Sequence, residues 1–289
     1  MINAVDKDFI KSPLNYVGGK YKLLPQILPH FPNNINRFVD LFAGGGNVAI
    51  NVDANQIYFN DKQSEVVGLI SYLYGHDVDF LLSEIDDIIE QYSLNKTNRE
   101  GYLQLRADYN KGKKSPMRFY ALIAHAFNNQ IRFNKSGGFN MTFGKDRSSF
   151  NPKLRERFIC FIEELHEKSL VFRDDDFRTF DFGEISNLGG SDLVYCDPPY
   201  LITTAAYNES GGWTERDERD LYAILDSLDE QGVRFALSNV LEHKERINDI
   251  LIEWSGRYNV RELSASYANA NYQSTKRDSI TREVLITNY

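Results

Sequence analysis

Short apolar runs that end in polar or glycine-rich turns recur along the chain, and most are followed by a longer stretch with helical periodicity. These runs predict strands at residues 37–42, 57–59, 170–172, 193–196, 233–237 and 282–287. Apolar residues at spacings of three and four predict helices at residues 64–74, 77–109, 115–127, 151–168, 214–231 and 241–254. Strands that alternate with helices are typical of an α/β fold, in which helices cover both faces of a sheet.

The strand predicted at residues 193–196 ends in Asp197-Pro198-Pro199-Tyr200. Two prolines have no N–H to donate to a sheet, so the strand must stop there. A carboxylate, a stiff loop and an aromatic ring are thereby held at the carboxyl end of a strand, where open α/β sheets bind ligands. A turn that only ends a strand would also suit these residues, so the motif needs support from the rest of the chain.

The motif suits the methylation of an exocyclic amine on a flat base. The lone pair of such an amine is delocalised into the ring, which makes the nitrogen a poor nucleophile. The Asp197 carboxylate and the Pro198 carbonyl can each accept one N–H hydrogen bond and turn the lone pair toward an electrophilic methyl group. The Tyr200 ring can stack on the base, because every base offers a π-face.

Two glycine loops precede this motif. Residues 12–20 place Gly18 in a loop, where glycine allows close backbone approach to a ligand, and Lys20 in the first turn of a helix. The strand at 37–42 is followed by Ala43-Gly44-Gly45-Gly46 and a short predicted helix. A strand, a glycine turn and a helix bring backbone N–H groups up to a cofactor.

Acidic residues follow two other strands. Asp61 is placed to bond ribose hydroxyls, although it would also suit the N-cap of the helix at 64–74. We favour the ribose because the glycine turn directly precedes Asp61 in the βαβ unit. An Asp-Phe pair follows the strand at 170–172 and can hold an adenine ring. Because three aspartates, Asp174 to Asp176, precede Phe177, the aspartate that would contact the adenine stays open.

The net charge of −8 conceals a basic block. Residues 106–157 contain 12 Lys/Arg and 3 Asp/Glu, whereas the rest of the chain contains 21 Lys/Arg and 38 Asp/Glu. A basic block inside an acidic protein is better explained as a phosphate-facing surface than as an ordinary solvated face. Within it, residues 128–145 predict a β-hairpin whose amides, cations and aromatic rings are of the kinds that read base edges, stack on bases and hold phosphates.

The remaining features limit the class of protein. No apolar run reaches the length of about 18 residues that predicts a membrane span, and the polar N-terminus is unlike a secretory signal. The two cysteines, Cys160 and Cys196, form no metal-binding pattern and are expected to be small buried hydrophobes in a reducing cytoplasm. The segment 201–213 predicts a loop over the site that orders when substrate binds.

The motifs occur in the order typical of one enzyme family. They are Tyr16-Val17-Gly18-Gly19-Lys20, Asp40-Leu41-Phe42-Ala43-Gly44-Gly45-Gly46, Asn60-Asp61, Arg132-Phe133-Asn134, Phe139-Asn140, Phe143-Gly144, Asp197 to Tyr200 and Thr287-Asn288-Tyr289. Nearly from end to end, the chain resembles the Dam-like, D12-class adenine-N6 DNA methyltransferases. Each motif is short, but their joint order is highly specific.

The resemblance implies S-adenosylmethionine (SAM) as methyl donor, S-adenosylhomocysteine as product, a flipped adenine in duplex DNA as acceptor, and no metal. It implies a Rossmann-like methyltransferase sheet in a catalytic domain of residues 1–75 and 169–289. A mostly helical target-recognition domain with the β-hairpin is expected at residues 76–168, where the basic block also lies.

The family's functional residues transfer position by position. Lys20 matches the lysine that holds the methionine carboxylate of SAM, and Tyr16 matches an aromatic residue, usually tryptophan, of the same pocket. The other cofactor-binding positions implied are Gly18, Asp40, Phe42, Gly44, Gly46, Asp61, Asp176, Phe177 and Asp197. The catalytic loop is Asp197, Pro198, Pro199 and Tyr200.

The expected DNA contacts come from the first loop, the hairpin and a late polar loop at 266–279. They are Asn15, Asn128, Asn129, Gln130, Arg132, Asn134, Lys135, Asn140, Thr142, Lys145 and Arg277. GATC-directed members of the family have a lysine where Asn15 stands, and commonly a hydrophobic residue at Gln130 and a proline at Thr142. Arg132 is retained and can pair with a guanine edge. These departures argue against GATC, while an adenine target is still expected.

The expected reaction flips an adenine out of the duplex, and its N6 attacks the SAM methyl in line. Proximity supplies most of the catalysis, because the sulfonium is already an activated donor. We expect a cytoplasmic monomer that acts either beside a restriction endonuclease of the same site or as an orphan methylase.

Three other functions stay open on the sequence alone. The same fold can methylate another planar amine, such as RNA adenine or cytosine N4, or it can serve as a non-catalytic DNA-binding module. A nicotinamide oxidoreductase is a distant alternative, because Phe42-x-Gly44-x-Gly46 lacks the GxGxxG spacing. The Asp at the first position of the catalytic loop and the basic hairpin favour DNA adenine.

Overall fold

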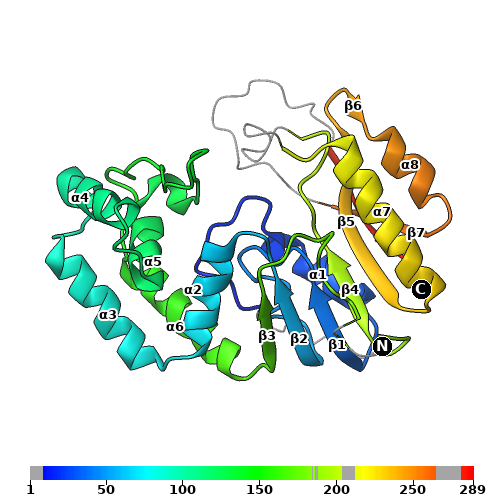
Figure 1. Ribbon diagram of the computed structural model, residues 1–289, viewed down its shortest axis with the longest axis horizontal. Helices are drawn as coiled ribbons and strands as arrows, with labels where there is room; N and C mark the ends of the chain where they lie inside the picture. Colours follow the sequence, from blue (N-terminus) through cyan, green and yellow to red (C-terminus); the bar gives the residue numbers. More distant parts are fainter. Residues whose placement is uncertain (1–8, 184, 186–187, 204–211, 265–280) are drawn as a thin grey trace. The chain divides into compact units, whose positions relative to one another are not determined.

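The structure is a computed structural model that describes residues 9–183, 185, 188–203, 212–264 and 281–289 (Figure 1). Its internal contacts divide the chain into two compact units. The first unit comprises Met1–Tyr21, Gly44–Asn51 and Gln63–Asp174, and the second comprises Lys22–Ala43, Val52–Lys62 and Asp175–Tyr289. Each unit therefore gathers segments that are far apart in the sequence.

A sheet forms the centre of the second unit. Its strands include β1 (Ile35–Asp40), β2 (Ala54–Asn60), β4 (Leu193–Cys196), β5 (Arg234–His243), β7 (Asn259–Leu263) and β8 (Thr281–Thr287). They lie in the order β2-β1-β4-β5-β8-β7. The first four are parallel, whereas β8 runs antiparallel to β5 and β7. The predicted α/β class is confirmed.

The strand order reverses between β1 and β4. β2 pairs with one edge of β1 and β4 with the other, so that Asp40 lies opposite Tyr195 in register. In open α/β sheets, the crevice outside the carboxyl ends at such a switch point binds ligands. The topology thus places Asp40, at the end of β1, and Asp197, just after β4, beside each other at the carboxyl ends of the parallel strands.

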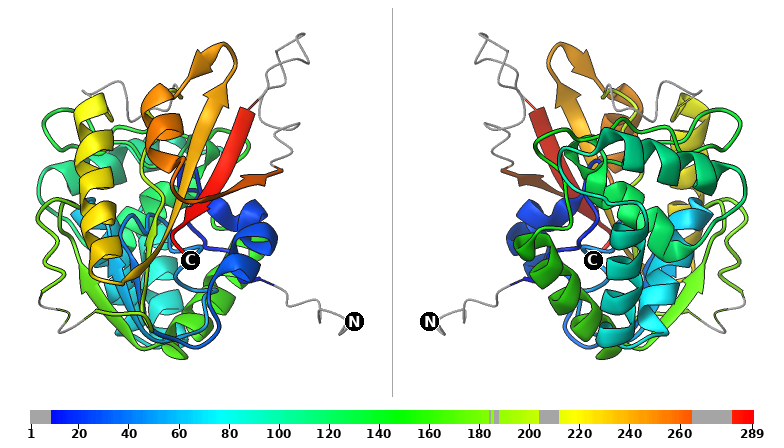
Figure 2. Two further views of the ribbon diagram at one scale, coloured as in Figure 1. Left: turned by 90° about the vertical axis from the view of Figure 1, so that its right-hand side faces the viewer. Right: turned by 90° about the vertical axis from the view of Figure 1, so that its left-hand side faces the viewer.

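Helices of the second unit cover both faces of this sheet. They include α1 (Leu24–Ile27), α7 (Glu215–Glu230) and α8 (Asp249–Ser255). Because side chains alternate along a strand, Phe38 and Tyr195 stack together on the side of α1, where both contact Phe31. Val39 and Val194 point the other way into the core that α7 and α8 cover, and Figure 2 shows the helices on opposite sides of the strands.

Local signals fix the start of α7. Thr214 is its N-cap and accepts a hydrogen bond from the Asp217 N–H, while the Asp217 carboxylate accepts one from the Thr214 N–H. This capping box satisfies two backbone donors at the helix terminus. The predicted helix at 214–231 is confirmed.

The prediction for the segment after residue 237 was wrong. β5 continues to His243, because residues beyond Leu237 pair with β8. Lys244 then turns with a φ of 60° into β6 (Arg246–Ile247), which pairs back onto β5, and the helix begins only at Asp249. Apolar residues in a strand buried on both faces had imitated helical periodicity.

Helices dominate the first unit. They are α2 (Ser64–Tyr74), α3 (Val78–Gln91), α4 (Arg99–Asn110), α5 (Pro116–His125) and α6 (Pro152–His166), with the short strand β3 (Leu170–Arg173) after them. α5 is central: it contacts α2, α3 and α4, and most of its residues are buried. The pattern predicted at 77–109 divides in two where Asn98 caps α4. Among the described residues, no helix is long and apolar enough to cross a membrane.

The predicted hairpin forms with sparse pairing. Two isolated antiparallel bridges, Ala126 to Phe143 and Phe133 to Phe139, connect its arms. Asn110 of α4 holds the returning arm by accepting from the Phe139 N–H and donating to its carbonyl, both at 2.9 Å. The hairpin is therefore held from α4 as well as by its own strands.

Two smaller expectations were wrong. Cys196 is buried, but Cys160 is exposed, because the buried stripe of α6 consists of Leu154, Phe158, Phe161, Ile162 and Leu165. The short helix expected after the Gly44 loop is a series of turns that includes a helical bond from the Ile50 N–H to the Gly46 carbonyl.

The contact-based units group α2 with the inserted helices, because it packs on α5 and α6. The functional division into residues 1–75 and 169–289 against 76–168 stays a prediction.

Candidate active site

Buried polar groups gather at the carboxyl ends of the parallel strands in the second unit. Asp40 is 1% exposed at the end of β1, and the next residue, Leu41, donates its N–H to the Tyr195 carbonyl at 3.0 Å. Asp197 follows Cys196 on the adjacent strand. The predicted cofactor residue Asp40 and the predicted catalytic residue Asp197 thus belong to neighbouring strand ends.

Asn60 ties two loops together at this edge. Its carboxamide donates to the Leu41 carbonyl at 3.0 Å and to the Asp175 carbonyl at 3.1 Å, and it accepts from the Asp175 N–H at 3.0 Å. Its own carbonyl accepts from the Ala43 N–H at 2.8 Å. With an exposure of 1%, Asn60 fixes the loop after β1 to the aspartate run.

Three aromatic rings cluster beside these loops. The centroids of Phe42 and Phe177 are 5.5 Å apart, and Trp213 lies 5.8 Å from the first and 5.3 Å from the second. Buried Glu218 of α7 accepts from the Trp213 indole N–H. Such a cluster offers flat apolar surfaces of the kind that accept a purine ring.

Arg178 fixes the Asp-Phe pair. Its guanidinium lies 4.4 Å from the Phe177 ring centroid and bonds Asp217 and Asp220 of α7 at 2.6 and 2.8 Å. The Asp176 carboxylate is 3.6 Å from the same guanidinium. Asp175, by contrast, bonds Asn60 through its backbone N–H and carbonyl, so Asp175 and Asp176 have different surroundings.

A pair of carboxyl groups holds Tyr200 of the predicted catalytic loop. The Tyr200 hydroxyl lies 3.0 Å from Asp197 Oδ1 and 3.0 Å from Glu283 Oε1 of β8. Burial of the hydroxyl, together with the adjacent Asp197 carboxylate, raises the pKa of Tyr200 well above its ordinary value. Burial likewise raises the pKa of the Cys196 thiol, so this cysteine stays a neutral thiol.

The first unit brings the two glycine loops together. A Cβ on Gly44, which has a φ of 50°, would lie 2.9 Å from Cδ1 of the Tyr16 ring. Asn47 bridges the loops, because its Oδ1 accepts from the Ser12 N–H at 3.1 Å. Tyr16 and Gly44, predicted for one pocket from separate motifs, are therefore in direct contact.

Lys20 is a buried cation, with an exposure of 4%, in the 3₁₀-helix η1 (Lys20–Leu23). Its ammonium donates to the Gly18 carbonyl at 2.8 Å. Asp61 is also buried, at 8%. Asp61 is not the N-cap of α2, because that position is Gln63. The competing explanation for Asp61 is thereby removed, and its ribose role stays a prediction.

Several hairpin amides have structural partners. Asn134 Oδ1 accepts from the N–H groups of Ser136 and Gly138, and Asn129 donates to the carbonyls at the end of α5. Arg132 donates to Asn140 through Nε and its guanidinium terminus. Asn15 donates to the Asn128 carbonyl at 2.7 Å, which ties the first loop to the hairpin base.

Other predicted DNA contacts stay on the surface. Lys135, Thr142 and Lys145 are exposed, and Gln130 is half-buried. Arg277, with the loop at 266–279, and residues 204–211 lie outside the described residues.

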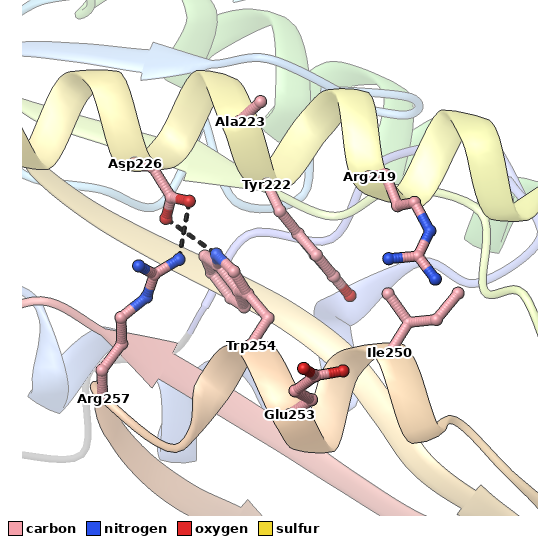
Figure 3. Close-up of a pocket in the computed structure, with 8 residues that line it drawn as sticks. All are labelled: Arg219, Tyr222, Ala223, Asp226, Ile250, Glu253, Trp254 and Arg257. Atoms are coloured by element: carbon pink, nitrogen blue, oxygen red, sulfur yellow. Dashed lines mark hydrogen bonds and ion pairs between the residues drawn. The ribbon is translucent and has the colours of Figure 1, made fainter.

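A separate cleft lies between α7 and α8 (Figure 3). It is lined by Arg219, Tyr222, Ala223, Asp226, Ile250, Glu253, Trp254 and Arg257. Asp226 accepts from the Trp254 indole N–H at 2.8 Å and pairs with Arg257 at 2.6 Å. The cleft contains none of the predicted site residues, and its polar groups join the two helices.

Two residues of the site, Trp213 and Glu283, were missed from the sequence, and the role of a third, Asn60, was not recognised. Trp213 had no local signal, because its ring meets Phe42 and Phe177 only in the fold. Asn60 was recognised only as part of a motif. Glu283 did have a signal, since it is an acidic residue within the apolar run of the last strand.

The chain matches known proteins along most of its length. The family model of the D12 class N6 adenine-specific DNA methyltransferase matches residues 16–278. The chain is 48% identical over 97% of its length to the type II methyltransferase M.FokI of Planomicrobium okeanokoites, and 43% identical over 98% to the modification methylase StsI of Streptococcus sanguinis. It covers 43% of the length of each of these relatives.

A DNA adenine methylase of Vibrio cholerae is 27% identical over 78% of the chain and 80% of that relative.

Proposed function

The chain belongs to the D12 class N6 adenine-specific DNA methyltransferase family, and from this membership we propose that it transfers a methyl group from SAM to N6 of a flipped adenine in duplex DNA. Its sheet is accordingly a Rossmann-like methyltransferase sheet. The proposal rests above all on Asp197, a carboxylate held by a tyrosine at the switch point of that sheet.

Each unit offers residues that suit one part of SAM in this proposal. The Phe42, Phe177 and Trp213 rings suit its adenine, and Asp61 suits its ribose. The Gly44 loop has no room for a Cβ beside Tyr16, and Lys20 offers a buried cation for a carboxylate. When bound, SAM supplies a methyl group activated by its sulfonium. The remaining cofactor residues are Gly18, Asp40, Gly46, Asp176 and Asp197.

The chain's own residues prepare the acceptor. Asp197 and the Pro198 carbonyl accept the two N–H bonds of the adenine amine and turn its lone pair outward. Pro199 limits the freedom of the loop, and the Tyr200 ring stacks on the flipped base. Because the hydroxyl of Tyr200 is anchored, the direction of the long axis of that ring is fixed in advance.

The first unit supplies target recognition in this proposal. Its basic block neutralises phosphates, and the exposed hairpin side chains contact bases and backbone. The Nε and terminal donors of Arg132 already engage Asn140, so the pair would approach a guanine as one group. We propose a recognition site other than GATC. We also propose that the protein acts as a cytoplasmic monomer, either beside a restriction endonuclease of the same site or as an orphan methylase.

The test is methylation of a mixed-sequence duplex with labelled SAM, followed by mapping of the modified bases. We expect N6-methyladenine in one short motif, and loss of about 10²–10⁴-fold in activity for Asp197→Ala, because the amine loses its charged acceptor. Asp53→Ala, at an exposed carboxylate, is the control and stays active. Cofactor binding without any DNA methylation would redirect the search to another amine.

A further inference from the structure

The hydroxyl of Tyr200 stands between two carboxyl groups. Its oxygen is 3.0 Å from Asp197 Oδ1 and 3.0 Å from Glu283 Oε1. Tyr200 therefore connects the amine-binding carboxylate with an acidic residue 83 positions further along the chain.

Glu283 lies inside the sheet. It pairs with Val240 of β5 on one side and with Leu263 of β7 on the other, and its exposure is 1%. Its neighbour Val284 points to the core under α7 and α8, so strand alternation directs Glu283 to the opposite face. A carboxyl group at such a position is costly unless a hydrogen bond compensates for its burial.

The two contacts need two hydrogens. An oxygen–oxygen distance of 3.0 Å is a hydrogen bond only when a hydrogen lies between the atoms. The tyrosine hydroxyl has one hydrogen and can accept another. The second hydrogen therefore belongs to Asp197 or to Glu283.

We propose that Glu283 is a positioning residue of the methyl-transfer site: it donates this second hydrogen to the Tyr200 oxygen, and so directs the hydroxyl hydrogen onto Asp197. The opposite arrangement would put a hydrogen on Asp197, where the proposed function requires an acceptor for the amine.

This inference rests on the proposed function and extends its site. Glu283 touches neither substrate nor cofactor; it acts through Tyr200, whose donated bond keeps one oxygen of Asp197 in place. The other oxygen of the carboxylate then has a defined direction toward the amine. A positioned acceptor affects the chemical step more than the binding of SAM.

The experiment compares Glu283→Gln with Glu283→Leu in steady-state methylation. The glutamine amide can donate to the Tyr200 oxygen, so Glu283→Gln keeps kcat within about threefold of wild type, whereas Glu283→Leu loses about 10- to 100-fold in kcat with little change in the KM for SAM. Glu262→Leu, at an exposed carboxylate of neighbouring β7, is the matched control and keeps its kcat.

Tyr200→Phe provides the second arm. It removes both contacts, so adding Glu283→Leu or Glu283→Gln to it lowers kcat no further. The second of these double variants keeps the test valid should Glu283→Leu fail to fold. Additive losses, a normal kcat in Glu283→Leu, or a kcat in Glu283→Gln as low as in Glu283→Leu would each overturn the proposal. A wild-type protein that methylates no DNA would instead contradict the proposed function itself.

Discussion

The strand ends of the second unit and the hairpin of the first unit hold their polar groups in opposite ways. Asp40 and Asn60 at the strand ends and Glu283 within β8 are each 1% exposed, and the side chains of this region bond other side chains or neighbouring loops. In the hairpin, a side chain of the neighbouring helix holds the backbone. Asn110 bonds both the N–H and the carbonyl of Phe139, whereas the side chain of Lys135 is exposed.

Under the proposed function, the difference shows how one chain can combine a fixed chemistry with a changeable target. Methyl transfer needs its acceptor placed to a fraction of an ångström, which strand ends and buried partners provide. Recognition needs exposed side chains that can change without unfolding the protein, which an anchored loop provides. The following predictions test this contrast in order of decreasing effect.

The largest effect is expected for Trp213→Ala. It removes one ring of the aromatic cluster, so we expect about 3–5 kcal/mol of lost stability and a rise of about 10- to 100-fold in the Kd of SAM. Calorimetry without DNA measures the affinity. Trp254→Ala is the matched control, because both tryptophans are 8% exposed and donate to a carboxylate. A comparable rise in Kd for Trp254→Ala would contradict the assignment of the rings.

Asn60→Asp keeps the size of the side chain but removes its two donated bonds. The Leu41 and Asp175 carbonyls would then face a carboxylate, so we expect a loss of about 2–3 kcal/mol in the free energy of unfolding and weaker SAM binding. Urea unfolding measures the free energy of unfolding, and calorimetry measures the affinity for SAM. Asn55→Asp, at an exposed position on the same strand, should change neither.

Asn110→Leu releases the hairpin from α4. We expect a loss of about 1–2 kcal/mol in stability and weaker DNA binding, while the Kd of SAM stays unchanged. Fluorescence anisotropy with duplex DNA and calorimetry with SAM separate the effects. Gln104→Leu, on the exposed side of α4, is the control. Loss of SAM binding in Asn110→Leu would contradict the assignment of the hairpin to DNA recognition alone.

The smallest effect concerns the opposite end of β1 and β4, where Arg37 bonds Asp192 at 2.7 Å. Burial alone would raise the pKa of Asp192, but bonds from Arg37 and the Gly189 N–H outweigh it and lower the pKa below its ordinary value. Because the folded pKa is lowered, this carboxylate stabilises the fold above its unfolded pKa of about 3.9, and the contribution is lost as pH falls through the folded value.

Asp192→Asn should therefore cost about 1 kcal/mol near neutral pH, and less as the pH falls toward the folded pKa. Thermal unfolding of both proteins across this range measures the difference. Activity should be unchanged, because this end of the strands lies away from the catalytic loop. A stability difference that grows on acidification would refute the ion pair's role.

The sequence by itself determined the strands β1 to β4 and β8, the start of β5 and the order of the motifs, whereas β6 and β7 were not predicted. The chemistry of the catalytic loop stays a prediction. Prolines must end a strand, as they do after Cys196, and a run such as residues 193–196 is apolar enough to be buried wherever it packs. Periodicity also located α2 and α7 closely, because the apolar stripes of both helices and the capping box of α7 are local features. The family followed from the joint order of short motifs.

Only the tertiary structure decided which side chains meet. Asn60 reaches Asp175 across 115 positions and Tyr200 reaches Glu283 across 83, and no local pattern encodes such distances. The strand β5 was misread for the same reason, since its pairing with β8 overrides its helix-like spacing. A sequence specifies what each segment can form alone, whereas burial and hydrogen-bond pairing between distant segments select what it does form.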